Sequence, residues 1–148
     1  MTRTAIIGTL SAAEMKRTYT GSCHCGAVSY EADLDLSAGT FKCNCSICTK
    51  LRNWFAVVPP DAFRLLSDES EIGEYQFGKK TIHHLFCKRC GVGSFGWGMD
   101  SKLGGRFYAI KVNCLDDATV DELAHAPVQY LDGRHDNFKA APAETRHL

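Results

Sequence analysis

Hydrophobic and polar residues alternate along much of this chain, as they do in half-buried β-strands. The alternation is clearest over residues 27–32 and 73–77, and Pro59 ends the apolar run before it, because proline cannot donate to a strand ladder. Gly78 begins a turn of the kind that joins two strands of a hairpin. We predict strands over residues 27–32, 40–42, 54–58, 73–77, 81–86 and 106–112, and a short strand or turn over residues 61–66.

A helical pattern is confined to residues 119–124, which Asp116 or Asp117 could cap. The 148 residues contain no repeat, no low-complexity stretch and no long linker. We therefore predict a mainly β fold in a single domain over residues 17–131. Residues 1–16 are expected to form an N-terminal tail. Residues 132–148 form a polar C-terminal extension, which either folds over a cleft or is a second tail.

The formal net charge is zero, because 17 Lys and Arg residues balance 17 Asp and Glu residues. A nucleic-acid-binding surface needs a concentrated basic face, which this composition does not indicate. No segment approaches the roughly 18 apolar residues of a membrane span, and no signal-peptide core follows the short apolar run near the N-terminus. We expect neither a nucleic acid nor a membrane as a partner.

Seven of the eight cysteines lie in three tight clusters. Thiols this close in sequence suit zinc better than a disulfide, because they can point at a common centre and leave little chain to close around. Free thiols of this kind favour a reducing compartment, so we expect a cytoplasmic protein. The clusters are Cys23 and Cys25, then Cys43, Cys45 and Cys48, and finally Cys87 and Cys90.

The first and third clusters together supply the four thiolates of a closed zinc site. Gly26 and Gly91 follow them, and glycine permits the positive φ of a tight turn whose backbone N–H groups face the sulfurs. Because the two pairs lie far apart in sequence, zinc bound between them adds its binding energy to the folding energy. His24 lies inside this turn and is not expected to be catalytic. We interpret the set as a structural zinc site formed by Cys23, Cys25, Cys87 and Cys90.

The remaining triplet supplies only three thiolates, which leaves one position of a tetrahedral zinc site open, as in catalytic sites. We expect Cys43, Cys45 and Cys48 to lie on one short loop and to hold a second zinc. A substrate thiol bound at the open position would lose its proton and become a nucleophile. Binding two zinc ions through seven thiolates changes the formal charge by −7 + 4 = −3.

Three other side chains could close the triplet site: Cys114, His83 or His84. The two histidines are adjacent in a predicted strand, so they face opposite sides and at most one can reach the site. An iron–sulfur cluster is a further alternative, although the spacing lacks the ferredoxin patterns.

The glycine-rich segment over residues 91–98 is not a phosphate-binding loop, because it lacks the Lys-Ser/Thr ending and the following helix. Its glycines are expected to let the backbone bend past the zinc. Phe95 and Trp97 would then pack in the core or line a cleft.

Three cysteine motifs, in order, resemble the glutathione-dependent formaldehyde-activating enzyme family, and most closely its branch that includes centromere protein V. The motifs are Gly-Ser-Cys-His-Cys-Gly-Ala-Val at residues 21–28, Cys-Asn-Cys-Ser-Ile-Cys-Thr-Lys at residues 43–50 and Phe-Cys-Lys-Arg-Cys-Gly at residues 86–91. Residues 113–117 resemble the closing motif of the family, and the resemblance runs from about Tyr19 to about Leu123.

This resemblance implies a zinc-stabilised fold of twisted antiparallel sheets, the β-tent. It implies a structural zinc on the four-thiol set and a catalytic-type zinc on the triplet. The named reaction of the family joins glutathione and formaldehyde into S-hydroxymethylglutathione, which the carbon–sulfur lyase class describes in reverse.

Glutathione carries two carboxylates and one ammonium, so cationic contacts are expected in a site that binds it. Lys50 and Arg52 directly follow the triplet and are candidates, unless they are only solvated surface charges. Trp54 and Phe55 could wall the pocket, although aromatic strand residues more often belong to a core.

Two classes of function remain open at this stage. One is a zinc enzyme that acts on a small thiol or its adduct, which the triplet without an obvious fourth ligand favours. The other is a zinc-stabilised binding module without catalysis, which the absence of a clear acid–base pair favours.

Overall fold

A computed structural model describes residues 15–148, so all but the last two residues of the predicted N-terminal tail lie outside the described residues. Within this part of the chain, ten strands form two sheets, and two short α-helices lie between consecutive strands of the larger sheet. The prediction of a mainly β fold in one domain is confirmed. No helix in this part of the chain combines the length and apolar composition needed to cross a membrane.

The smaller sheet has three antiparallel strands in the order β1-β2-β5. Alternate residues of the central strand are buried, which is the pattern that predicted it. The strands are β1 (Arg17–Ser22), β2 (Ser29–Leu34) and β5 (Phe63–Leu65).

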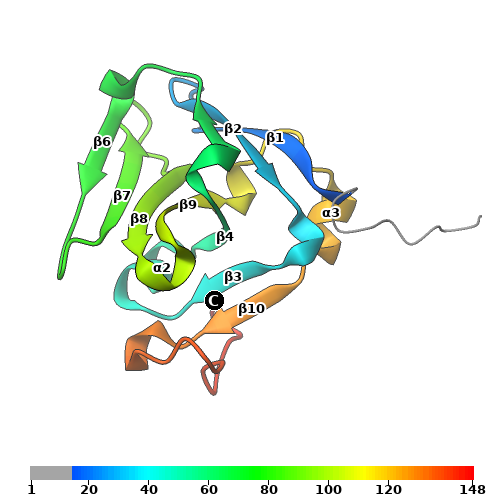
Figure 1. Cartoon of the computed structure of the whole chain (residues 1–148), viewed down its shortest axis with the longest axis vertical. Coiled ribbons are helices and arrows are strands. Elements are labelled where there is room, and N and C mark those ends of the chain that lie inside the picture. Colours follow the sequence, from blue (N-terminus) through cyan, green and yellow to red (C-terminus); the bar gives the residue numbers. More distant parts are fainter. Residues whose placement is uncertain (1–14) are drawn as a thin grey trace, which may run out of the picture.

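The larger sheet has seven strands in the order β10-β3-β4-β9-β8-β7-β6, with β6 and β7 at one end and β10 at the other (Figure 1). All neighbours are antiparallel except β10 and β3, which run parallel. Long crossovers permit such pairs, so the antiparallel prediction misses this one contact. The strands are β3 (Thr40–Cys43), β4 (Trp54–Val58), β6 (Ile72–Tyr75), β7 (Ile82–Cys87), β8 (Phe95–Asp100), β9 (Gly105–Lys111) and β10 (Val128–Leu131).

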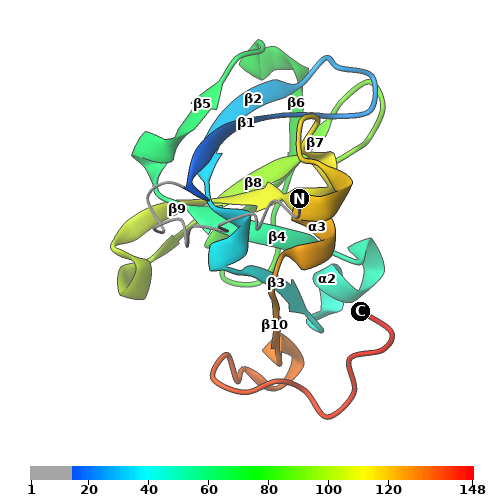
Figure 2. The ribbon, with the colours of Figure 1, turned by 90° about the vertical axis from the view of Figure 1, so that its right-hand side faces the viewer.

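The hydrophobic core lies between the two sheets (Figure 2). The Tyr30 ring is fully buried there, with its centroid 5.3 Å from that of Phe63 and 5.2 Å from that of Phe95. Its hydroxyl donates a 2.8 Å hydrogen bond to the carbonyl of Ser94, which satisfies the buried polar atom. Aromatic packing of this kind fixes one sheet over the other.

Two helices flank the larger sheet: α2 (Ser46–Leu51) and α3 (Val120–His125). Helix α3 is the predicted one, but its N-cap is Thr119 and not Asp116 or Asp117. The Thr119 hydroxyl and the Glu122 carboxylate form a reciprocal capping box. Helix α2 was not predicted, because it is only six residues long and its one buried residue is Cys48, so it shows no hydrophobic period.

Glu122 also ties α3 to the first strand. Its carboxylate accepts hydrogen bonds from the Arg17 guanidinium at 2.8 and 2.9 Å and from the Tyr19 hydroxyl at 2.8 Å. Hydrogen bonding from Arg17, together with the backbone N–H of Thr119, lowers the pKa of Glu122 to about 2. The carboxylate is therefore charged at neutral pH and anchors the helix.

Strands β1, β8 and β10 lie in segments for which no strand was predicted. Strand β8 was missed for a physical reason, since glycine takes the place of a larger residue at positions 96 and 98. A Cβ atom at Gly96 would lie 2.7 Å from the carbonyl oxygen of His83 on the neighbouring strand. The glycine-rich segment is therefore a closely packed strand from Phe95 onward, where a bend was expected.

Candidate metal centres

Four cysteines from distant parts of the chain converge beside the core. The Sγ atoms of Cys23, Cys25, Cys87 and Cys90 all lie within 4.8 Å of one another. The Cys25 sulfur is 3.7 Å from that of Cys23 and 3.6 Å from that of Cys87. None of the four is in a disulfide. These four sulfurs could hold one metal ion, and such a set suits zinc.

Backbone N–H groups face these sulfurs, as the turn residues predict. Gly26 and Gly91 have φ of 83° and 79°, in the left-handed region that favours glycine. The N–H groups of Arg89 and Cys90 point at the Cys87 sulfur from 3.3 and 3.5 Å. Such contacts stabilise a thiolate, so they lower the pKa of Cys87. The pKa of Cys90 falls to about 6 because the N–H groups of Val92 and Cys25 reach its sulfur.

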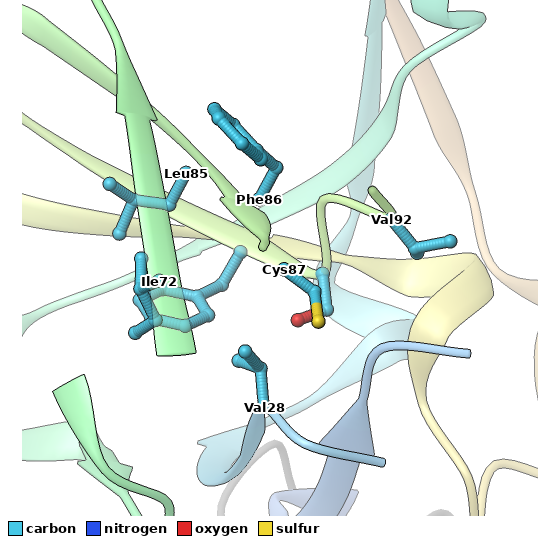
Figure 3. Close-up of a pocket in the computed structure, with 8 residues that line it drawn as sticks. Val28, Ile72, Leu85, Phe86, Cys87 and Val92 are labelled. Carbon is cyan, nitrogen blue, oxygen red and sulfur yellow. The ribbon is translucent and has the colours of Figure 1, made fainter. Parts of the chain in front are cut away.

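Apolar side chains surround the inner side of this four-thiol centre. Figure 3 shows Cys87 among Val28, Ile72 and Val92, close to Leu85 of the same strand. Cys87 is fully buried, while Cys25 at the other side of the centre is exposed. The centre therefore lies at the edge of the core, where it can bind the two sheets together.

The triplet forms a second centre at the junction of β3 and α2. Cys43 ends the strand, Cys45 is the N-cap of the helix and Cys48 lies in its first turn. Their Sγ atoms also lie within 4.8 Å of one another. The prediction of a single loop is therefore wrong, because only Cys45 lies between the two elements.

The start of helix α2 favours a thiolate in this centre. Hydrogen bonds from the thiols of Cys43 and Cys48, and then the N–H groups of Cys48 and Ile47, lower the pKa of Cys45. Three converging thiols with a readily formed thiolate could hold a metal ion.

No further Cys, His, Asp or Glu of residues 15–148 joins the triplet. The Cys114 sulfur lies 3.9 Å from the carbonyl of Gly93, outside both centres. His83 stacks on Trp97 with ring centroids 3.5 Å apart, whereas His84 stacks on Phe77. The two histidines therefore face opposite sides of β7, as predicted, and neither closes the triplet.

Lys111 and Asn53 adjoin the triplet, and sequence reasoning did not find them. The Asn53 amide donates to the Cys48 sulfur at 3.5 Å, and its oxygen accepts a hydrogen bond from the Lys111 ammonium. No carboxylate of the described chain forms a salt bridge with Lys111. Burial lowers its pKa, while nearby Cys48 acts in the opposite direction. The sequence did contain a signal for Lys111, namely a charged residue at the end of an apolar strand.

The segment after β10 folds over the triplet. Asp132 accepts a 2.8 Å hydrogen bond from the Asn44 side chain, and the backbone N–H of Arg134 donates to Asn44 at 3.0 Å. Between them, Gly133 packs directly on the centre: an added Cβ would lie 2.5 Å from the Cys43 sulfur and 3.1 Å from the Cys45 Cβ. The C-terminal extension was expected either to fold over a cleft or to be a tail, and its first residues fold over the triplet.

The family model described as glutathione-dependent formaldehyde-activating enzyme matches residues 18–131. The chain belongs to this family. A crystal structure of a Rhodobacter sphaeroides protein is similar to it, with a TM-score of 0.62 and 28% sequence identity over 74% of this chain and 99% of that chain. Both cysteine centres lie within the matched residues, whereas the segment that covers the triplet follows them.

Three residues were predicted to contact glutathione: Lys50, Arg52 and Trp54. Lys50 and Arg52 are exposed at the end of α2, whose first turn carries Cys48. Trp54 packs against the core, and its indole N–H donates to the Thr40 hydroxyl at 2.7 Å. Phe55 instead pairs with Lys111 across β4 and β9. A role in substrate binding stays a prediction for Lys50, Arg52 and Trp54.

Proposed function

We propose that this protein binds a small thiol such as glutathione at a zinc ion held by Cys43, Cys45 and Cys48. It would then join the thiol to formaldehyde or a similar small carbonyl compound, the chemistry of a carbon–sulfur lyase in reverse. The observation that supports this best is a triplet of converging thiols that no fourth side chain of the described residues completes. Membership of the formaldehyde-activating family supports the substrate class.

A second zinc, on Cys23, Cys25, Cys87 and Cys90, would be structural. Four thiols complete a tetrahedron, so no position remains for a substrate. This set joins the turn after β1 to the end of β7, and metal bound there would contribute to folding. The free thiols of both centres suit a reducing compartment such as the cytoplasm.

In the proposed reaction, zinc would lower the pKa of the substrate thiol so that the thiolate forms near neutral pH. The thiol proton leaves, a C–S bond forms, and the carbonyl π bond becomes an alkoxide that takes a proton from water. Lys111 places a positive charge beside the anionic centre, which favours each added thiolate. Asn53 orients the Cys48 sulfur through its hydrogen bond. Lys50 and Arg52 would contact the glutathione carboxylates.

An alternative function is a zinc-stabilised binding module without catalysis. One observation favours it: Gly133 packs on Cys43 and Cys45, so the C-terminal segment already covers part of the triplet. The same cover can also exclude water from a reaction, so it does not weigh against the enzyme.

Cobalt substitution tests the proposal, because the spectrum of cobalt reports its ligands. Glutathione should change the spectrum of the cobalt-loaded protein, S-methylglutathione should change it much less, and a Cys43→Ser variant should not respond. Rapid consumption of formaldehyde in the presence of glutathione should depend on the same cysteine. An unchanged spectrum at millimolar glutathione would contradict the enzyme and favour the binding module.

A further inference from the structure

The larger sheet carries a cleft on the face opposite the triplet. Side chains alternate along β9, so Lys111 faces the triplet while Arg106 and Tyr108 face the smaller sheet. The sheet backbone separates the two places. A ligand in this cleft would therefore bind independently of the metal centre in the proposed function.

The cleft lies between β5 and the strands β6 to β9 and has a volume of about 280 Å³. Its floor is apolar, formed by Phe63, Leu65, Leu85 and Phe95, which are buried or half-buried. The space suits one ligand of about the size of an amino acid.

Flat aromatic surfaces line the cleft. The rings of Phe63 and Tyr108 stack with centroids 4.1 Å apart and an interplanar angle of 8°. The Trp97 ring contacts the His83 ring and also lies 4.0 Å from the guanidinium carbon of Arg106. These contacts hold the side chains in place, so the walls of the cleft are rigid and largely aromatic.

The mouth of the cleft carries one cation and one carboxylate without ionic partners. Arg106 forms no salt bridge with any carboxylate of residues 15–148, and neither does Glu69 with any cation there. Glu74, also at the cleft, is paired with His83. A ligand with a carboxylate and an ammonium group complements this arrangement, whereas a doubly anionic ligand meets two acidic side chains.

We propose that this cleft binds a free α-amino acid with an apolar, and best an aromatic, side chain. The carboxylate pairs with Arg106, the ammonium group with Glu69, and the side chain lies on the apolar floor. The planar guanidinium, already held over Trp97, offers two parallel N–H groups to the carboxylate.

Calorimetric titration of the zinc-loaded protein with L-phenylalanine tests this proposal. Phenylalanine should bind saturably in the millimolar range or tighter. N-acetyl-L-phenylalanine, which lacks the ammonium group, and L-phenylalaninamide, which lacks the carboxylate, should each bind about tenfold more weakly, because each loses one charged hydrogen bond. Equal binding of the three compounds, or no saturable binding of phenylalanine, would overturn the proposal.

Variants locate the binding and separate it from the metal chemistry. Arg106→Gln should weaken phenylalanine binding about tenfold, while Arg146→Gln, whose arginine pairs with Glu144 elsewhere on the surface, should not change it. Cys45→Ser should keep phenylalanine binding even though it abolishes the response of the triplet to glutathione. Unchanged affinity in Arg106→Gln, or lost affinity in Cys45→Ser, would show that the amino acid binds elsewhere.

Discussion

Gly133 brings the backbone of the C-terminal segment into contact with the triplet. Because a methyl group there would lie 2.5 Å from the Cys43 sulfur, Gly133→Ala must displace either the segment or the sulfur. We expect the variant to fold, to retain one metal ion and to bind the second at least about tenfold more weakly. Elemental analysis after dialysis against a mild chelator measures this.

The control for this glycine is Lys139→Ala, which removes an exposed side chain in the same segment. It should keep both metals. If Gly133→Ala also retains two metal ions through dialysis, the segment does not support the triplet.

Lys111 is a charge whose nearest counter-charges are thiols. We expect Lys111→Met to weaken metal binding at the triplet about three- to tenfold, because removing one nearby charge typically costs about 1 kcal/mol. Folding should not suffer, since an apolar side chain of similar length needs no desolvation. Competition with a chromophoric chelator measures the affinity, and Lys102→Met, at an exposed position, is the control. Equal metal affinity of the two variants would show that Lys111 does not stabilise the metal bound at the triplet.

At the scale of elements, Glu122 links helix α3 to strand β1. Glu122→Gln should lower the free energy of unfolding at pH 7 by about 1–2 kcal/mol, because charged hydrogen bonds to Arg17 and Tyr19 are lost. The folded pKa of about 2 lies below the ordinary value of about 4.3. The contribution is thus complete above the ordinary value and disappears as the pH falls through the folded one.

Urea unfolding of Glu122→Gln and the parent protein at several pH values checks this. Acid also releases metal from thiolates, so the difference between the two proteins at each pH is the informative quantity. That difference should shrink between pH 5 and pH 3, values that bracket the ordinary carboxyl pKa of about 4.3. Glu144→Gln, whose carboxylate pairs with an exposed arginine, should differ little from the parent. A constant difference across the range would exclude ionisation of Glu122 as its cause.

The elements that the sequence predicts are those whose hydrophobic period is intact. Strands β2 and β4 bury apolar residues at every second position, and the capping box of α3 adds a local signal. Strand β8 lacks side chains at Gly96 and Gly98 because the neighbouring strands approach closely there. Helix α2 has six residues and buries a single one, Cys48, so it shows no hydrophobic stripe. Close packing in β8 and the metal-site residues of α2 thus remove the hydrophobic period by which these two elements could have been predicted.

At the scale of the whole molecule, the four-thiol centre connects the two sheets and the triplet does not. Cys87→Ser should therefore lower the thermal stability strongly and reduce solubility, because it would open the proposed structural zinc site at the core. Cys45→Ser should leave a folded domain without its second metal. Circular dichroism and thermal melts distinguish the two, and an equal loss of structure would show that both centres are structural.

The ligand sets could be predicted from the sequence, and their surroundings could not. Short spacings bring the cysteines of each cluster together whatever the rest of the chain does, and the need of a closed zinc site for four ligands assigned the two pairs to one centre. Lys111 meets the triplet only through the pairing of β4 with β9, and Gly133 only through the parallel pairing of β10 with β3, whereas Asn53 meets it because the end of α2 returns the chain to Cys48. Such contacts depend on tertiary structure, which a single sequence does not reveal.

The parallel pairing of β10 with β3 also sets an order of events during translation. A nascent chain possesses every ligand of the four-thiol centre once Cys90 has left the ribosome, so that metal can be captured early. The triplet emerges sooner, yet Lys111, β10 and Gly133 reach it only after the residues up to Gly133 have also been made. Until then Gly133 cannot cover the Cys43 sulfur, so we expect the three thiols to be more accessible to oxidants than in the folded protein. The segment around Gly133 thus covers, after synthesis of the triplet, a metal-binding group that was accessible before.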